Sequence, residues 1–173
     1  MGFTIVLFFT ALFSTAQAVE LTHSGHHLYL DNPQEWEIGK DLFGIPFMLF
    51  SPAANGQRSN ISFAHTGVEL ELEAKALKDN QLSYQENKKK WAQVHQVSIK
   101  SFLPYQSFHN NHNYLVHSIG MVYESEQKTY IETSYYTECK GVILFSKSLR
   151  LEKNSEHEKY FRSLINSLDC GVL

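Results

Sequence analysis

The alternation of polar and apolar residues predicts several short strands in the first half of the chain. Segments 27–30, 45–50 and 60–65 are rich in apolar residues and lie next to turn-forming residues, which is typical of strands. Residues 68–74 alternate strictly between apolar residues and glutamates, so we expect a strand there too. Residues 51–59 contain proline, glycine and small polar residues, which predicts a loop.

A helix is predicted for residues 78–93, where Ser83 and Glu86 have the spacing of a capping box. The face expected to pack against the rest of the protein consists of Tyr84, Trp91 and Val94. The opposite face carries the lysine triplet Lys88, Lys89 and Lys90, which we expect to be solvated.

The second half of the chain predicts an antiparallel meander. Candidate strands recur at about ten to fourteen residues with polar turns between them, which favours sequential hairpins. These strands are residues 97–108, interrupted by Pro104, then 114–123, 129–137 and 142–149. Residues 109–113 form a polar hairpin tip, and residues 124–127 form the next turn.

The C-terminal segment has the clearest helical pattern in the chain. Ser155 and Glu158 fit a second capping box, and Gly171 is a plausible C-terminal cap. A single apolar stripe at helical spacing consists of Phe161, Leu164, Ile165 and Leu168. Strands, a helix, a meander and a final helix together predict an α+β fold, in which helices flank a central antiparallel sheet.

Composition and charge exclude several classes of protein. The 173 residues are 43% hydrophobic and 19% charged, which fits one ordinary globular domain. The 15 basic and 18 acidic residues give a formal net charge of −3, so we expect no nucleic-acid partner.

The first 18 residues have the pattern of a secretory signal peptide. An apolar run ends at Ala16-Gln17-Ala18, a small-x-small cleavage site, although no lysine or arginine precedes the run. We expect cleavage after Ala18, a single mature domain at residues 19–173, and a periplasmic or secreted protein. No other segment approaches the roughly 20 apolar residues that span a bilayer, so we expect no stable membrane insertion after cleavage.

Export changes the interpretation of the cysteines. Cys139 and Cys170 are the two cysteines of the chain, and an even number in an oxidising compartment favours a disulfide. Two free thiols or a catalytic cysteine are the alternatives. A nucleophilic cysteine needs a nearby histidine, and none lies close in sequence to either residue.

Nine histidines are many for a chain of this length, and imidazole is a common metal ligand. The candidates for weak metal binding lie in two polar segments, and they are His23, His26, His27, His109 and His112. Neither segment contains a cysteine or an obvious carboxylate that would complete a tetrahedral set. We therefore expect exposed loop histidines, no dedicated metal site and no cofactor.

No catalytic motif stands out. Ser118 precedes Ile119-Gly120, which is half of a nucleophile-elbow signature, and we expect it in the interior of a strand. The meander contains five tyrosines: Tyr114, Tyr123, Tyr130, Tyr135 and Tyr136. Tyrosine is enriched at interfaces, so some of these could form an exposed binding patch, and ordinary packing within the sheet is the alternative.

The order of motifs resembles the PsbP/DcrB-like superfamily over roughly residues 27–170. Trp36 lies near the start of the mature chain, a strand at 45–50 leads into the loop at Ser51-Pro52, and residues 58–63 run from an arginine into an Asn-hydrophobic-Ser strand. A helix, a meander and an amphipathic helix follow. The resemblance implies an α/β/α sandwich. The chain departs from the lipoproteins of the DcrB group because it has no lipidation cysteine, and its cysteine pair has no place in the family pattern.

Members of this superfamily mostly act in binding or assembly, and they supply no catalytic residue to transfer to this chain. We therefore expect an exported, non-enzymatic binding or assembly protein of the bacterial cell envelope that acts through a preformed sheet surface. Its partner would be another envelope protein or an incoming protein. The alternative is a periplasmic metal-handling protein that uses the histidine-rich loops.

Overall fold

The computed structural model describes residues 17–23, 26–32, 36–53, 57–65, 79–139 and 142–171. Residues 1–16 of the expected signal peptide and the strand expected at residues 68–74 lie outside these described residues.

A seven-stranded antiparallel sheet forms the centre of the molecule, in the order β3-β4-β5-β9-β8-β7-β6. Its strands are β3 (Glu37–Leu42), β4 (Ile45–Phe50), β5 (Asn60–His65), β6 (Ser98–His109), β7 (Leu115–Ser125), β8 (Lys128–Cys139) and β9 (Val142–Leu151). A smaller sheet in the order β1-β2-β10 consists of β1 (Gln17–His23), β2 (His26–Asn32) and β10 (Asp169–Gly171).

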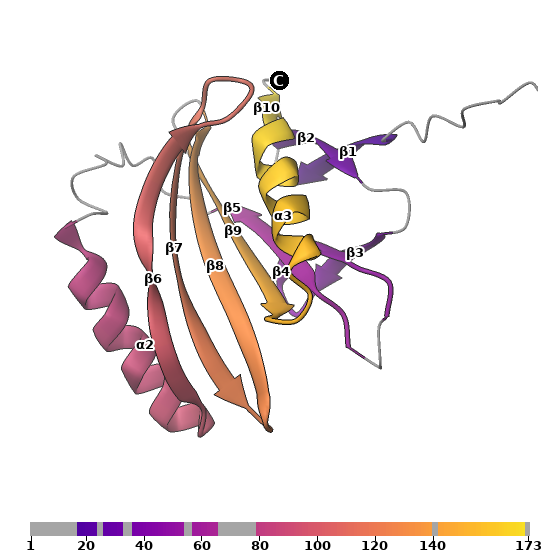
Figure 1. The fold of residues 1–173 in the computed structure, drawn as a ribbon. Coiled ribbons are helices and arrows are strands. Elements are labelled where there is room, and N and C mark those ends of the chain that lie inside the picture. Colours follow the sequence, from indigo (N-terminus) through magenta and orange to yellow (C-terminus); the bar gives the residue numbers. More distant parts are fainter. Residues whose placement is uncertain are drawn as a thin grey trace, which may run out of the picture.

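Two helices cover opposite faces of the large sheet (Figure 1). Helix α2 (Gln81–His95) packs near the edge strand β6, and helix α3 (Glu156–Ser167) lies over β9 and the small sheet. This arrangement confirms the predicted α+β sandwich with a central antiparallel sheet and flanking helices. The strands predicted at 45–50 and 60–65 are β4 and β5.

The predicted meander is confirmed as the run β6-β7-β8-β9. The turn between β7 and β8 consists of Glu126 and Gln127, which both have positive φ, the geometry that suits a two-residue hairpin. The register between β6 and β7 shifts between Ile99 and Ser101 and again between Leu103 and Gln106. Pro104 lies inside the second irregularity, because proline has no N–H to donate to the ladder.

The main core lies between α3 and the large sheet. All four residues of the predicted apolar stripe are almost fully buried: Phe161, Leu164, Ile165 and Leu168. The expected cap at Gly171 is wrong, because the chain continues into β10 and Gly171 pairs with His27 of β2. A side chain could not replace this glycine easily, since a Cβ would lie 2.7 Å from the ring of Tyr29.

Helix α2 differs from its prediction at both the start and the packed face. Asn80 is its N-terminal cap, so Ser83 is inside the helix and the expected capping box is wrong. Val94 is 78% exposed, whereas Lys88 lies over the rings of Tyr84 and Trp91. Positions 84, 88 and 91 share a face by helical spacing. Lys88 can point inward because a buried carboxylate of the sheet receives it.

The structure joins Cys139 at the end of β8 to Cys170 in β10 through a disulfide, with Cα atoms 5.6 Å apart. This is the pairing that the sequence predicts, and it connects the meander to the strand that follows α3. In the part of the chain that the structure describes, no helix is long and apolar enough to cross a membrane.

Candidate functional site

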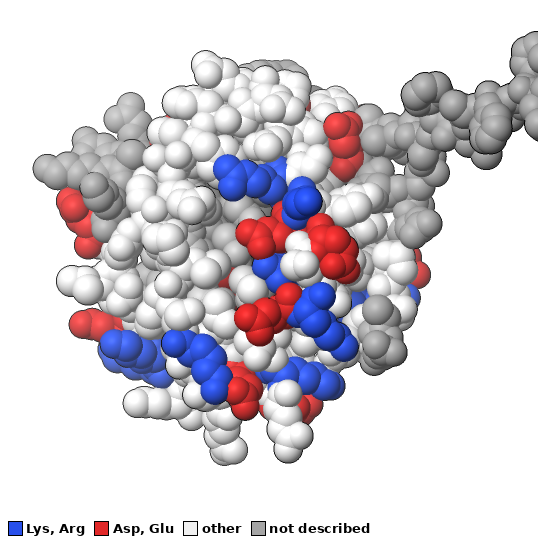
Figure 2. Space-filling model, in the orientation of Figure 1, with Lys and Arg blue, Asp and Glu red and all other residues white. Residues whose placement is uncertain are grey.

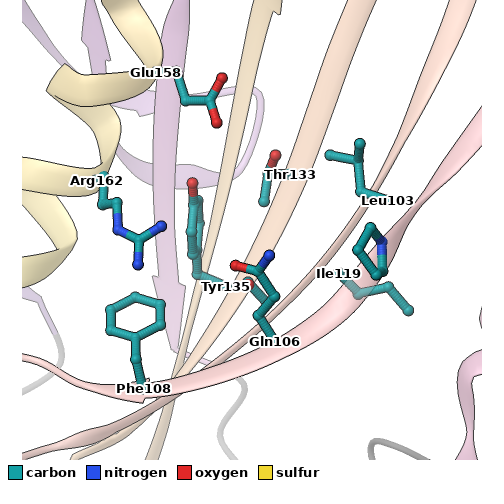
Figure 3. A pocket seen from close by; sticks show the side chains of 10 residues that line it. Leu103, Gln106, Phe108, Ile119, Thr133, Tyr135, Glu158 and Arg162 are labelled. Atoms are coloured by element: carbon teal, nitrogen blue, oxygen red, sulfur yellow. The ribbon is translucent and has the colours of Figure 1, made fainter.

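A cleft of about 150 Å³ opens between α3 and the strands β6, β7 and β8. Helix α3 lies over β9 and the small sheet. On the face of the large sheet that α3 covers, the helix does not extend over all of β6 (Figure 1). The cleft is lined by Leu103, Pro104, Gln106, Phe108, Ser118, Ile119, Thr133, Tyr135, Glu158 and Arg162. Figure 3 shows Arg162 and Glu158 on the helix side, with Tyr135 and Gln106 on the sheet side.

Cross-strand register brings the sheet residues of the cleft together. Gln106 pairs with Ser118, and Ser118 pairs with Tyr135, so three neighbouring strands place these residues in one row. Leu103 and Thr133 form the next row, on either side of Gly120. A Cβ on Gly120 would lie only 2.4 Å from the carbonyl oxygen of Glu132, so this position needs glycine.

Helix α3 contributes two charged side chains, one turn apart. Glu158 forms an ion pair with Arg150 of β9, whose guanidinium is almost fully buried. Arg150 also donates to the backbone carbonyls of Leu151 and Glu152, at 3.3 Å each. These bonds hold the Glu158 carboxylate at the rim of the cleft.

Arg162 has a different environment from Arg150. Its guanidinium carbon lies 5.1 Å from the centre of the Phe108 ring, in a cation–π contact between α3 and β6. No carboxylate forms an ion pair with Arg162 among the described residues. Glu158 and Arg162 are the charged residues that line the cleft. Because Arg150 neutralises Glu158 from β9, the charge of Arg162 is left in excess.

Tyr135 lies at the floor of the cleft. Burial raises the pKa of its phenol, so the hydroxyl stays protonated under physiological conditions. The hydroxyls of Ser148 and Thr133 contact it. The floor of the cleft is therefore polar but neutral, and the only ionic groups are on the α3 side.

A second cavity, of about 180 Å³, lies on the other side of Arg150. It is lined by Gln57, Arg58, Ser59, Tyr130, Leu149, Arg150, Leu151 and Asn154. Both of its arginines already have carboxylate partners, Glu37 for Arg58 and Glu158 for Arg150. It therefore offers no unpaired charge, and the cleft beside α3 is the stronger candidate.

The expectation of exposed loop histidines is only partly confirmed, because His23, His26, His27 and His109 lie in strands and only His112 lies in a turn. His23 and His26 face each other in the β1–β2 hairpin, but their side chains lie outside the described residues. Nδ1 of His27 lies 2.6 Å from a carboxylate oxygen of Glu20. His109 and His112 are exposed. Among the residues that the structure describes, no group of three or more histidine, cysteine or acidic side chains could hold a metal ion.

Ser118 lies inside β7, as predicted. Its neighbour His117 points to the opposite face of the sheet, because adjacent residues of a strand alternate. There His117 is almost fully buried, with Nδ1 2.7 Å from the Tyr105 hydroxyl and Nε2 3.3 Å from Glu138. These contacts tie β6, β7 and β8 together.

The expectation of exposed tyrosines in the meander is wrong. All five are buried or half-buried: Tyr114, Tyr123, Tyr130, Tyr135 and Tyr136. The alternative, ordinary packing, is confirmed, because these rings meet other side chains of the sheet, as Tyr136 meets Phe145 with ring centres 5.2 Å apart. Tyr114, for example, donates to the carboxylate of Asp169 at 3.1 Å, and Tyr123 stacks on Tyr130 with ring centres 5.4 Å apart.

Sequence reasoning did not identify the cleft. The helical spacing of Glu158 and Arg162 places them on one face of α3, and this was a usable signal. Their partners Phe108 and Arg150 come from other strands, and local periodicity does not reveal such pairings.

No protein-family model matches the sequence, and no curated protein matches it. Among solved structures, the chain is similar to LpqN, a protein involved in cell envelope biogenesis of Mycobacterium tuberculosis. The TM-score is 0.60 at 10% identity, over 89% of this chain and 90% of that one. It is also similar to cyanobacterial PsbP from Synechocystis sp. PCC 6803, with a TM-score of 0.57 at 8% identity, over 92% of this chain and 95% of that one. The likeness shows the fold alone: this is a PsbP-like fold, as the resemblance implied.

Proposed function

We propose that this chain is an exported, non-enzymatic binding or assembly protein of a bacterial cell envelope, and that it holds a partner protein through the cleft between α3 and β6–β8. The observation that carries the proposal is the cleft itself. It combines a cation that has no carboxylate partner among the described residues, a polar floor and the apolar side chains of Leu103 and Phe108, the mixture that recognition sites use.

Hydrogen bonds connect the two walls of the cleft, which favours binding. The tip of the β6–β7 hairpin is tied to the end of α3, because the side-chain amide of Asn110 donates to the carbonyls of Ile165 and Leu168. The backbone N–H of Asn111 donates to the carbonyl of Asn166 at 3.0 Å. A preformed surface loses little conformational entropy when a partner binds.

The ionisable groups of the cleft suit recognition better than proton transfer. Glu158 is held by Arg150, and Arg162 lies against an aromatic ring. The raised pKa of Tyr135 keeps its phenol neutral. Ser118 has no histidine on its own face next to it in the strand, since His117 points away. These features support a binding role, although a test for turnover remains part of the proposal.

Two observations support an envelope location. Structural disulfides persist in oxidising compartments, and Cys139 is bonded to Cys170. The similar fold of LpqN belongs to a protein described as involved in cell envelope biogenesis. The partner would be another envelope protein or an incoming one.

Site-specific photocrosslinking in the source cell tests the proposal. A photoreactive amino acid at Gln106, in the cleft, should give a discrete crosslinked protein in the envelope fraction. The same photoreactive amino acid in place of Lys89, which is exposed on α2, is the matched control and should not capture that protein. Equal capture from both positions, no capture from Gln106, or catalytic turnover by the purified chain would contradict the proposal.

A further inference from the structure

The geometry points to a carboxylate as the group that the cleft recognises: an acidic side chain of the partner protein, anchored by Arg162. This inference rests on the proposed function and names the chemistry of its site. Arg162 supplies a positive charge in excess, because the Arg150–Glu158 pair is neutral and Arg162 has no carboxylate partner among the described residues.

The position of Arg162 presents its hydrogen-bond donors to the cleft. The guanidinium carbon lies 5.1 Å from the centre of the Phe108 ring, and among the described residues no carboxylate forms an ion pair with the N–H groups of this planar cation. Figure 3 shows the guanidinium on the helix side, pointing toward Tyr135 and Gln106 of the sheet. A carboxylate that enters there can accept two parallel N–H bonds, the strongest arrangement between these groups.

The remaining walls suit the other parts of an acidic side chain. Gln106 is exposed and offers a neutral amide next to the guanidinium. Leu103 and Phe108 offer apolar surface for methylene groups. Figure 2 shows charged residues in a band that begins over α3 and continues below it, whereas the surface directly beside α3 is largely uncharged.

Size and charge favour a protein side chain over other anions. The volume of about 150 Å³ is below the roughly 300–1,000 Å³ of ordinary small-molecule pockets, so the cleft suits one side chain of a larger partner. A phosphate carries up to two negative charges, and the Glu158 carboxylate on the same rim repels a dianion more strongly than a carboxylate.

Peptide titration of the full chain, followed by NMR, tests the inference. The probes are the capped tripeptides Ala-Glu-Ala and Ala-Gln-Ala, which differ only in the carboxylate. The Glu peptide should shift the Arg162 Nε–H and Gln106 amide signals saturably and bind at least about tenfold more tightly than the Gln peptide. The difference should shrink between about 0.1 M and about 1 M salt, as the Debye length falls from about 10 Å to about 3 Å.

Two charge-matched variants separate the site from the general charge of the helix. Arg162→Gln should abolish the preference for the Glu peptide with only a small change in the melting temperature, because the side chain is exposed and loses only its contact with Phe108. Lys159→Gln removes the same charge from an exposed position of α3 and should keep the preference. Equal binding of both peptides, loss of preference in both variants, or tighter binding of inorganic phosphate would overturn the inference.

Crosslinking from Gln106 in the Arg162→Gln background distinguishes the two proposals. If the wild type captures a partner and the variant does not, both are supported. If capture persists at full yield in the variant, the cleft binds a partner but the carboxylate inference is overturned. If the wild type captures nothing although the Glu peptide binds as expected, the proposed function fails and the carboxylate site stands.

Discussion

Helices α2 and α3 pack on opposite faces of one sheet, but different forces hold them. Helix α3 buries three large apolar side chains, Phe161, Leu164 and Ile165, in a continuous hydrophobic core. In α2 only Ala92 is buried. The two helices have similar lengths, so the difference lies in the sequence of each packed face.

The contacts of α2 are aromatic and ionic. Lys88 forms an ion pair with Glu132 of β8, a carboxylate that is 7% exposed. The same ammonium lies 5.6 Å from the centre of the Tyr84 ring and 5.4 Å from that of Trp91. Trp91 in turn meets Tyr123 edge-on at 5.5 Å. Removal of a charge should therefore destabilise the packing of α2, whereas removal of apolar side-chain atoms should destabilise the packing of α3.

The two helices therefore contribute differently to the stability of the domain. Apolar burial on the α3 side stabilises the whole domain and keeps the wall of the cleft in place. The α2 side depends on a few specific partners, so α2 can loosen without loss of the core. Four measurements can break or sharpen this contrast.

The largest effect is expected from Phe161→Ala. The ring is 1% exposed, so its removal leaves a cavity in the main core and should lower the free energy of unfolding by about 3–5 kcal/mol. Urea denaturation followed by circular dichroism measures the loss. Ser163→Ala, at an exposed position of the same helix, is the control and should change stability by less than about 0.5 kcal/mol. An equal loss from Trp91→Ala on α2 would contradict the contrast.

The disulfide should come next. The double variant Cys139→Ser/Cys170→Ser should lower stability by about 3–4 kcal/mol, because it opens a loop with a sequence separation of 31 residues. Non-reducing peptide mapping of the exported protein should show the two cysteine peptides linked. The expected destabilisation acts on the α3 side, since Cys170 belongs to the small sheet that α3 packs against. Two thiols that alkylate freely in the exported protein would refute the bond.

Lys88→Ala tests the α2 side. It leaves the Glu132 carboxylate buried without its cation, a change that usually costs about 3–5 kcal/mol. We expect about 2 kcal/mol, because Lys88 is itself 20% exposed and water can reach the vacated site. Lys88→Met combined with Glu132→Met should recover stability to within about 1 kcal/mol of the wild type. Lys89→Ala is the control, and a loss equal to that of Lys88→Ala would mean that α2 depends on general charge.

The two faces also differ in how far the sequence could predict them. The stripe from Phe161 to Leu168 is local, and helical spacing alone identifies it. The meander is equally local, because each hairpin joins neighbouring segments. The partner of Lys88 is Glu132, which is 44 residues away in the sequence. The local sequence around the lysine triplet therefore does not indicate that Lys88 points toward the sheet.

The cleft was missed for the same physical reason. Periodicity tells which residues of a strand share a face, but it does not tell which part of that face a distant helix leaves uncovered. Arg162 meets Phe108 only because α3 returns to the sheet after the whole meander. The exposure of the tyrosines could not be predicted for the same reason, since it depends on contacts with side chains of other elements, such as Phe145 for Tyr136 and Asp169 for Tyr114.

The smallest effect concerns pH and vanishes near neutrality. Burial raises the pKa of Tyr123 to about 12, with further contributions from the charges of Glu132 and Tyr130. The unfolded phenol ionises near pH 10. Because the folded state holds the proton more tightly, this contribution to stability is complete below pH 10 and is lost as the pH rises toward 12. Tyr84 and Tyr136 on the same face also have raised pKa values, caused mainly by burial. Burial likewise raises the pKa of Tyr135 and Tyr114 on the α3 side. The α3 side also has the larger apolar core, so the α2 face should open first in alkali.

The two tryptophans of the chain report the two faces separately. Trp91 lies on α2 against Tyr123, and Trp36 contacts Phe161 of α3 at 5.5 Å. With Trp36→Phe the emission comes from the α2 face, and with Trp91→Phe it comes from the α3 face. Between pH 10 and 12, the α2 reporter should change at a lower pH than the α3 reporter.

Adding Tyr123→Phe should move the α2 transition to higher pH and leave stability at pH 7 nearly unchanged, because both side chains are neutral there. If the two reporters change at the same pH, the two faces unfold as one unit, and the different contacts of α2 and α3 do not lead to different stabilities.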